Sequence, residues 1–263
     1  MGDPDVEVCL RLGPIWARTL VHAPEVWANS LGQAPDGLVL LLPAQSGGQA
    51  RMVLFNLDGS RPEACGNALR CLTRVACDVG FVPGPRFVVE TDAGERRVDA
   101  LCFEAKESRV GMGAPTLIDG ALKLKVGDRS VQGTSISVGN PHFVLRANSI
   151  ADSEVAGLGA QLCTHPQFPN GTNVEFVFGE PDRPRVRVWE RGVGETEACG
   201  SGACAVASAL WGTALLRRGL TLDLPGGPLM VGLNAHGLWL QGGAEWEILP
   251  AQEVRSAQSG IIR

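Results

Sequence analysis

The tetrapeptide Glu-Ala-Cys-Gly occurs twice in this chain, at residues 63–66 and again at residues 197–200. Each copy opens a stretch that is predicted to be helical; after the first copy, Leu69, Leu72 and Val75 recur at the spacing of one buried helix face. The two cysteines, Cys65 and Cys199, are therefore expected at or just before helix N-termini. Exposed backbone N–H groups and the helix dipole lower the pKa of a thiol in that position. Two such thiols at matching points of two chain halves predict an acid–base pair facing one another across a cleft.

The segments around the repeat are mostly strands, and they follow the same order in each half of the chain. In the first half we expect strands at residues 37–42, 51–56, 87–91, 96–103 and 109–112, with a helix at residues 66–79. In the second half we expect strands at residues 135–138, 142–145, 173–178, 186–189, 229–231 and 237–240, with a helix from residue 200 to about residue 216. This order predicts an α+β protein of two quasi-symmetric domains, each with strands around a central helix. A Gly-Ala-Pro segment at residues 113–115 gives the expected domains, 1–114 and 115–263, with an extreme C-terminus that can return to the first domain.

Charge and hydropathy exclude several classes of partner. The net charge is −5 and no cluster of lysine and arginine is present, so nucleic acid is not the expected partner. The longest apolar stretches, such as residues 38–43, are too short to span a bilayer. The first five residues are acidic and lack the basic region of a signal peptide. We therefore expect a cytoplasmic protein that does not bind membranes.

The chain has eight cysteines, and their spacing favours neither a disulfide scaffold nor a metal site. No Cys-x-x-Cys occurs, which argues against structural zinc. The length and the lack of an export signal argue against a disulfide framework. We expect the cysteines outside the repeat to be small buried side chains. These are Cys9, Cys71, Cys77, Cys102, Cys163 and Cys204.

Lysine usage argues against the commonest cofactor of amino-acid chemistry. Pyridoxal phosphate needs a lysine for its Schiff base. The only three lysines are Lys106, Lys123 and Lys125, and the last two stand in an alternating, surface-like stretch without a phosphate loop. We expect no cofactor.

Four segments together resemble the signatures of the diaminopimelate epimerase family. They are Asn56-Leu57-Asp58-Gly59-Ser60 with Ala64-Cys65-Gly66-Asn67-Ala68-Leu69-Arg70-Cys71, Val138-Gly139-Asn140-Pro141-His142, residues 168–176, and residues 190–204. They occur in the family's order, and the likeness runs from about residue 36 to about residue 250. One such motif is weak, but four in order are highly specific.

The resemblance implies a cofactor-independent epimerase whose active site lies between two quasi-symmetric domains. One cysteine, as the thiolate, removes the α-proton of an amino acid, and the other, as the thiol, returns a proton to the opposite face. Carried over, this pair is Cys65 and Cys199; which of them serves which enantiomer stays open. The implied reaction interconverts LL- and meso-diaminopimelate in the synthesis of lysine and peptidoglycan precursors. The resemblance also implies that the enzyme is a homodimer.

Further residues acquire roles through the same motif match. His142 and Glu190 are expected to position or deprotonate the thiols and to orient the substrate amine. Asn56, Asn140, Asn173 and Arg191 match positions that contact the distal end of the substrate, where amides and an arginine suit a zwitterionic diacid. Backbone N–H groups of Gly66 and Asn67, and of Gly200 and Ser201, would lie at helix N-termini and bind the α-carboxylate. Glu63 and Glu197 are expected to be incidental surface residues.

The N-terminal region departs from the family pattern, and two alternatives to the implied reaction stay open. The family normally has a Gly-Asn-Asp-Phe element there, whereas residues 11–18 contain no asparagine. Ala68 also replaces a usual glycine. The first alternative is a racemase of a different amino acid on the same scaffold. The second is a thiol–disulfide switch that uses Cys65 and Cys199.

Overall fold

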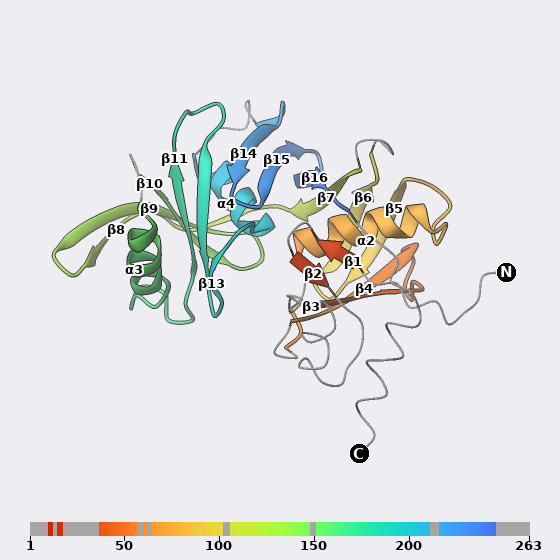
Figure 1. The fold of residues 1–263 in the computed structure, drawn as a ribbon, viewed down its shortest axis with the longest axis horizontal. Helices are drawn as coiled ribbons and strands as arrows, with labels where there is room; N and C mark the ends of the chain where they lie inside the picture. The colour runs from red at the N-terminus through yellow and green to blue at the C-terminus, as the bar shows by residue number, and fades with distance from the viewer. Residues whose placement is uncertain are drawn as a thin grey trace, which may run out of the picture. The chain divides into compact units, whose positions relative to one another are not determined.

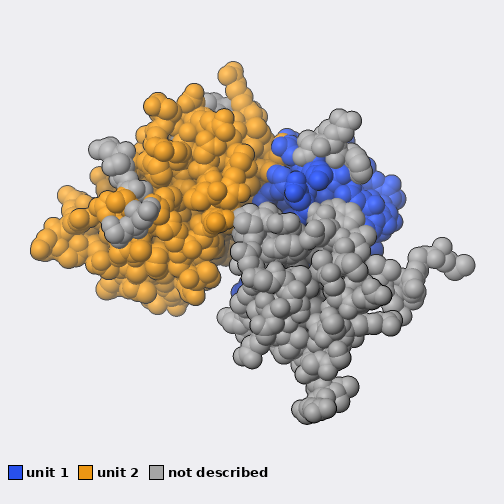
Figure 2. All heavy atoms as spheres, viewed as in Figure 1, with its two compact units in different colours: residues 1–110, 243–263 blue, residues 111–242 orange. Residues whose placement is uncertain are grey.

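The computed structural model describes residues 10–12, 15–17, 37–56, 60–62, 65–101, 106–147, 151–210 and 216–245. The chain divides into two compact units, one of residues 1–110 and 243–263 and the other of residues 111–242, coloured blue and orange in Figure 2. Both units combine β-sheet with few helices, so the protein is a two-domain α+β protein, as the sequence predicts (Figure 1). No described helix is long and apolar enough to cross a membrane.

The first unit is a sheet with one helix described against it. Its strands lie side by side in chain order: β1 (Leu10–Leu12), β2 (Ile15–Ala17), β3 (Gly37–Leu42), β4 (Ala50–Asn56), β5 (Arg86–Thr91), β6 (Gly94–Asp99) and β7 (Glu107–Gly113), whose last residues belong to the second unit. Helix α2 (Gly66–Asp78) packs against β3, β4 and β6. The predicted stripe of Leu69, Leu72 and Val75 is buried, which confirms the helix and its inward face.

A buried carboxylate fixes the turn between β3 and β4. Glu90 accepts the backbone N–H groups of Gln45, Ser46 and Gly48 at 2.8, 2.7 and 3.0 Å. These bonds favour the charged carboxylate and lower its pKa to about 2. Gly48 leaves the necessary room, because a Cβ at this position would stand 2.9 Å from Glu90 Cγ. The glutamate therefore has a structural role in this unit.

The described part of the second unit is a mixed sheet with two helices. Its strands are β8 (Thr116–Val126), β9 (Arg129–Ser137), β10 (Pro141–Arg146), β11 (Asn173–Phe178), β12 (Arg185–Glu190), β13 (Gly194–Thr196), β14 (Leu220–Leu224), β15 (Gly227–Asn234) and β16 (Gly237–Gly243). Their order is β8-β9-β10-β11-β12-β14-β15-β16, and β13 pairs with β12. Helix α3 (Asp152–Cys163) contacts β8, β11, β12 and β13, whereas α4 (Gly200–Leu210) contacts β9, β10, β11 and β15.

The two faces of the parallel pair β10 and β11 differ in chemistry. Alternate residues form one apolar face, on which Phe143 and Phe176 pack with Val155 and Leu162 of α3. The intervening residues put His142, Asn173 and Glu175 on the other face, where all three are buried. This second face meets α4, the helix that begins directly after Cys199. Burying polar side chains lowers the stability of the folded state, so this face of the sheet is a candidate for a functional site.

Several elements of the second unit differ from the sequence prediction. Helix α3, strand β14 and most of the long β8–β9 hairpin were not predicted; only residues 135–138 of the hairpin were expected as a strand. The hairpin alternates exposed lysines with Leu124 and Val126, whose side chains join the apolar core beside α3. The predicted helix after Cys199 is described as far as Leu210, and residues 211–215 of that prediction lie outside the described residues.

Candidate active site

Cys65 immediately precedes helix α2, as predicted. It is the N-cap residue, with an extended backbone (φ −140°, ψ 123°), and its carbonyl accepts the Leu69 N–H at 2.9 Å. The helix begins at Gly66, so the first N–H groups of α2, which have no acceptor within the helix, follow Cys65 directly in the chain. Cys65 is half-buried. Glu63 and Ala64, the start of this copy of the repeat, lie outside the described residues.

A buried arginine that the sequence interpretation did not single out lies close to Cys65. Arg70 Nη2 donates to Asn67 Oδ1 at 3.0 Å, and Nη1 donates to the Gly243 carbonyl at 2.5 Å. Burial lowers the pKa of this guanidinium, and the negative charges of Cys71 and Cys65 act in the opposite direction. The interaction is mutual, so the cation favours the thiolate of Cys65. The sequence feature that could have indicated this role is the position of Arg70, about one turn into the helix that follows Cys65.

Asn56 ends strand β4 and is exposed. Its Nδ2 donates to Ser60 Oγ at 2.9 Å, and its backbone N–H donates to the Ser60 carbonyl at 2.8 Å. These bonds close the predicted turn, whose residues Asp58 and Gly59 lie outside the described residues. Asn56 therefore anchors the segment that leads from β4 toward Cys65.

Cys199 lies directly before α4 and is only 5% exposed. Its Sγ accepts the Gly202 N–H at 3.4 Å and lies 3.5 Å from Ser201 Oγ. Burial raises the pKa of this thiol well above its ordinary value, and the charges of Glu190 and Glu175 raise it further. The Ser201 and Gly202 contacts lower it only in part. The expectation of a lowered pKa was therefore wrong for Cys199, because it considered the helix terminus and not the burial and the two carboxylates.

Glu190 is the carboxylate that contacts the Cys199 thiol. It ends strand β12, is half-buried, and accepts the Thr196 hydroxyl at 2.6 Å. Burial raises the pKa of its carboxyl, which a hydrogen bond with Cys199 and the bond from Thr196 lower in part. A carboxyl whose pKa is moved toward neutrality beside a thiol can exchange a proton with it. Glu197, by contrast, is exposed, as predicted.

A chain of hydrogen bonds connects the buried face of the sheet to Cys199. His142 Nδ1 lies 2.6 Å from Glu175 Oε1, and His142 Nε2 lies 2.9 Å from Asn140 Oδ1. Asn140 Nδ2 donates to Ser201 Oγ at 3.4 Å, and Ser201 Oγ contacts the thiol. The chain thus brings the predicted residues His142, Asn140 and Ser201 together with Glu175, which the sequence interpretation did not assign a role.

Arg191 follows Glu190 and is held by the loop before β11. Asn173 Oδ1 accepts the Arg191 backbone N–H at 2.9 Å, and Asn173 Nδ2 donates to the Pro141 carbonyl at 3.0 Å. Arg191 Nη1 donates to the Asn170 carbonyl at 2.7 Å, and the side chain is exposed. The Asn173 amide therefore fixes the arginine, whose guanidinium retains other donors for an anion.

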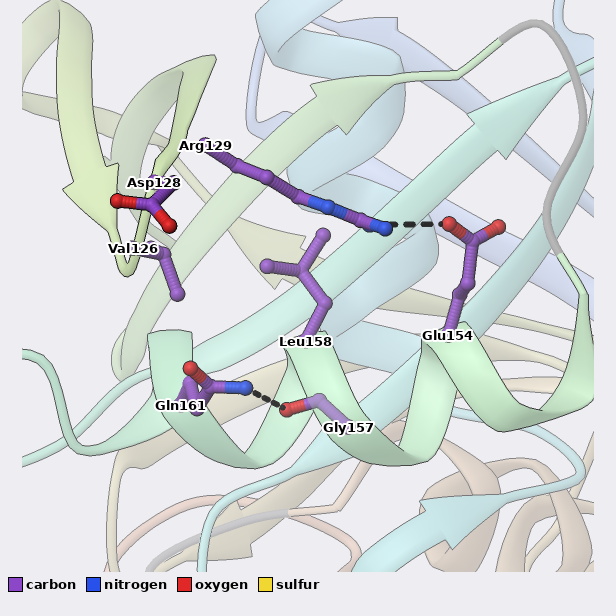
Figure 3. A pocket seen from close by; sticks show the side chains of 7 residues that line it. All are labelled: Val126, Asp128, Arg129, Glu154, Gly157, Leu158 and Gln161. Carbon is purple, nitrogen blue, oxygen red and sulfur yellow. Dashed lines mark hydrogen bonds and ion pairs between the residues drawn. The ribbon is translucent and has the colours of Figure 1, made fainter.

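The second unit also has a separate open cavity of about 400 Å³ (Figure 3). It lies between α3 and the β8–β9 turn and is lined by Val126, Asp128, Arg129, Glu154, Gly157, Leu158 and Gln161. Arg129 and Glu154 pair across it at 3.0 Å. None of the predicted site residues lines this cavity. Within the described ranges, no three His, Cys, Asp or Glu side chains are grouped so that they could hold a metal ion.

Solved structures that share this two-domain α+β fold include epimerases. A hydroxyproline epimerase from Agrobacterium vitis shares the fold with a TM-score of 0.67 over 92% of this chain and 90% of its own, at 14% identity. A predicted epimerase from Pseudomonas aeruginosa matches with a TM-score of 0.63 over 86% of each chain, at 15% identity. At these identities the likeness shows the fold alone.

Sequence comparison defines the family. The family model for diaminopimelate epimerase matches residues 17–118 and 134–246. A diaminopimelate epimerase from Desulforudis audaxviator is 41% identical over 250 residues, covering 89% of each chain. One from a Cyanothece species is 37% identical over 234 residues, covering 82% of this chain and 83% of its own. The chain belongs to the diaminopimelate epimerase family.

Proposed function

We propose that the protein is a cofactor-independent diaminopimelate epimerase that interconverts the LL and meso forms by a two-base mechanism. Family membership supports this proposal, as does the place of Cys65 and Cys199 directly before helices α2 and α4. The observation that carries it is the surroundings of Cys199, where a buried thiol meets Glu190 and the N-terminal N–H groups of a helix. Glu190 can act as an acid–base partner of the thiol, and the helix N-terminus beside it can bind an anion.

In the proposed reaction each cysteine works on one face of the substrate α-carbon. The thiolate of one cysteine takes the α-proton, so the C–H bond breaks and an S–H bond forms. The thiol of the other then gives its proton to the opposite face, so its S–H bond breaks and the new C–H bond forms. The two cysteines end with exchanged protonation states, and proton exchange with solvent, or turnover in the reverse direction, restores them.

The negative charge that develops on the substrate needs stabilisation from the protein. The proposal gives this task to the backbone N–H groups of Gly66, Asn67, Gly200 and Ser201, and it is supported by helices α2 and α4 beginning at Gly66 and Gly200, since helix N-termini bind anions. Preorganised donors of this kind lower the barrier because they need not reorient as charge develops. We assign the same four residues to carboxylate binding.

The remaining predicted residues divide between proton handling and binding. Glu190 exchanges a proton with Cys199, and His142, which is fully buried, acts on that cysteine through Asn140 and Ser201. Arg191 binds the distal carboxylate of the substrate, with Asn173 fixing its backbone. Asn56 and Asn140 contribute amide groups to the substrate.

Solvent deuterium exchange tests this function directly. LL-Diaminopimelate incubated in D2O should gain one α-deuterium as the meso form appears, and Cys65→Ala and Cys199→Ala should each abolish this. Exchange that persists in both variants would contradict the two-thiol mechanism. A panel of other amino acids separates the proposed substrate from that of a different racemase on the same scaffold.

Three finer features belong to the same proposal. We place the enzyme in lysine and peptidoglycan-precursor synthesis, in the cytoplasm, and as a homodimer, as the family resemblance implies. Sedimentation equilibrium over a range of protein concentrations tests the dimer, and a single species of 27.7 kDa would contradict it. Fractionation of cells that produce the protein tests its location.

A further inference from the structure

The second unit buries an ionisable pair on the sheet face that meets helix α4. His142 and Glu175 are both 0% exposed, and Nδ1 and Oε1 lie 2.6 Å apart. Burying two ionisable groups carries a large desolvation cost that one hydrogen bond offsets only in part. The opposite face of the same two strands packs with apolar side chains alone, which shows that these strands can be buried without an ionisable pair. The pair therefore calls for a functional explanation.

The neighbouring amides fix where the protons of this pair lie. Asn140 Nδ2 donates to Ser201 Oγ, so Asn140 Oδ1 is the atom that faces His142 Nε2 at 2.9 Å. A carbonyl oxygen only accepts, and therefore Nε2 must carry a proton. One further proton lies between Nδ1 and Glu175 Oε1, on either atom. The pair as a whole is neutral in both cases, which makes its complete burial tolerable.

The same protons give the hydrogen-bond chain a direction. Nε2–H donates to Asn140, Asn140 donates to Ser201 Oγ, and the Ser201 hydroxyl is then left to donate its own proton to Cys199 Sγ at 3.5 Å. This donation depends on a proton at Nε2. Glu175 secures that arrangement because it occupies Nδ1, the other ring nitrogen.

Gly202 of α4 leaves space for the Glu175 carboxylate beside Cys199. A Cβ on Gly202 would stand 2.9 Å from Glu175 Oε1 and 3.3 Å from Cys199 Sγ, so the carboxylate and the thiol flank the same glycine. The second oxygen, Oε2, is buried without a hydrogen-bond partner in the structure. A buried oxygen without a hydrogen bond lowers the stability of the folded state. Packing alone therefore does not explain a glutamate at this position. The ionisable groups that face this carboxylate are His142, Glu190 and Cys199.

We infer that Glu175 is a positioning residue of the epimerase reaction: it fixes the protonated ring nitrogen of His142 and, through Asn140, orients the Ser201 hydroxyl toward Cys199. The inference rests on the proposed function for its kinetic consequences. It assigns to Gly202 the role of admitting the carboxylate between the sheet and α4. Glu175 does not touch the substrate in this scheme.

The first measurement is an NMR spectrum of the histidine side chains, and it does not depend on enzymatic activity. The chain has four histidines, so imidazole-labelled protein gives a simple ¹⁵N–¹H spectrum. We expect His142 to show a proton on Nε2, and Glu175→Gln to lose this fixed state, because a glutamine amide can either donate to or accept from Nδ1. Glu90→Gln removes a buried carboxylate of the first unit and should leave the His142 signal unchanged. A wild-type His142 without a proton on Nε2 overturns the inference.

The second measurement is kinetic. Glu175→Gln should lower kcat on the order of 10- to 100-fold, as loss of a supporting hydrogen bond typically does, with KM nearly unchanged. In a Ser201→Ala background the same substitution should have little further effect, because the chain is already broken. Glu90→Gln should keep the wild-type kcat. A kcat of Glu175→Gln near the wild-type value, or additive effects with Ser201→Ala, overturns the inference. Absence of wild-type turnover would instead contradict the proposed function, and the His142 spectrum would still decide the role of Glu175.

Discussion

Gly171 lies against the side chain of Arg191, and a Cβ on this glycine would stand 2.8 Å from Arg191 Cδ. The glycine also has a φ of +72°, a conformation that side-chain-bearing residues rarely adopt. The neighbouring Asn170 carbonyl accepts from the guanidinium, and Asn173 accepts from the Arg191 backbone. The loop thus fixes the arginine at both its side chain and its backbone.

Replacing Gly171 by alanine should therefore impair distal binding of the substrate. We expect Gly171→Ala to raise KM about tenfold, equivalent to about 1.4 kcal/mol of lost binding, with a smaller effect on kcat. Steady-state kinetics with LL-diaminopimelate measure the two separately. Gly127→Ala is the matched control, since Gly127 also has a positive φ (+59°) but no atom within 4 Å of the added Cβ. If Gly127→Ala raised KM equally, backbone strain alone would account for the effect.

The sequence predicted the elements whose own pattern specifies them. Helix α2 has a clear apolar stripe, and β11 was expected at its observed bounds, residues 173–178. The repeat also placed both cysteines correctly, directly before α2 and α4. These features are local, because they depend on spacing along one segment of chain.

The roles of Arg70 and Glu175, and the raised pKa of Cys199, could not be derived in this way. Each depends on contacts between segments far apart in the chain. Arg70 bonds to Gly243, and Glu175 meets His142 from the neighbouring strand. Burial then determines the sign of the pKa shift at Cys199, and the depth of burial of one thiol is not visible in its own motif.

Helix α3 escaped prediction for a reason that can itself be tested. It contains Gly157 and Gly159, which are poor helix formers. A Cβ on Gly159 would stand 2.8 Å from Trp189 Cβ, so tertiary packing against β12 requires this glycine. A Cβ on Gly157 would meet no atom within 4 Å. The two glycines therefore differ in what they contribute.

Alanine at these two positions should have opposite effects on stability. We expect Gly157→Ala to raise the free energy of unfolding by about 0.5–1 kcal/mol through helix propensity. Gly159→Ala should lower it by about 1–3 kcal/mol, because overpacking against Trp189 outweighs the same gain. Denaturant unfolding of the two variants gives both values. Equal stabilisation by both would show that α3 does not pack on Trp189 as the structure has it.

The charge of Glu190 should control the reactivity of Cys199. Glu190 is, after burial, the largest cause that raises the pKa of this thiol. Glu190→Gln should therefore move alkylation of Cys199 by iodoacetamide to lower pH, while turnover falls on the order of 10²- to 10⁴-fold through loss of the acid–base partner. Mass spectrometry of the modified peptide over a pH series measures the shift. Glu197→Gln, at the exposed glutamate, should leave the profile in place, and a shift to higher pH in Glu190→Gln would contradict the electrostatic account.

The same raised pKa of Glu190 has a consequence for folding. An acid whose pKa is raised in the folded state contributes stability that is present below its unfolded pKa and is lost as pH rises through the folded pKa. The wild type should therefore lose stability relative to Glu190→Gln as pH rises from the ordinary range of a glutamate toward neutrality. Thermal unfolding of both proteins in parallel at several pH values checks the sign. A difference in Tm that does not change with pH would contradict the raised pKa.

The two cysteines have opposite electrostatic surroundings, because Cys65 interacts with the buried Arg70 cation while Cys199 interacts with two carboxylates. Removing the cation should make Cys65 a poorer nucleophile. We expect Arg70→Gln to slow alkylation of Cys65 at neutral pH by roughly tenfold, because the thiolate is less favoured without the cation, and Arg70→Lys to restore most of the rate. Peptide mass spectrometry after timed exposure to iodoacetamide measures both.

A buried arginine of the same helix provides the control for this effect. Arg74 pairs with Asp78 at 2.8 Å, so Arg74→Gln also disturbs buried hydrogen bonds of α2. If the rate at Cys65 responds to the nearby charge and not to loosening of the helix, Arg74→Gln should slow it far less than Arg70→Gln. Equal slowing in both variants, or no recovery in Arg70→Lys, would assign the effect to helix stability. The measured difference thus separates a charge that favours the Cys65 thiolate from a residue that only holds α2 in place.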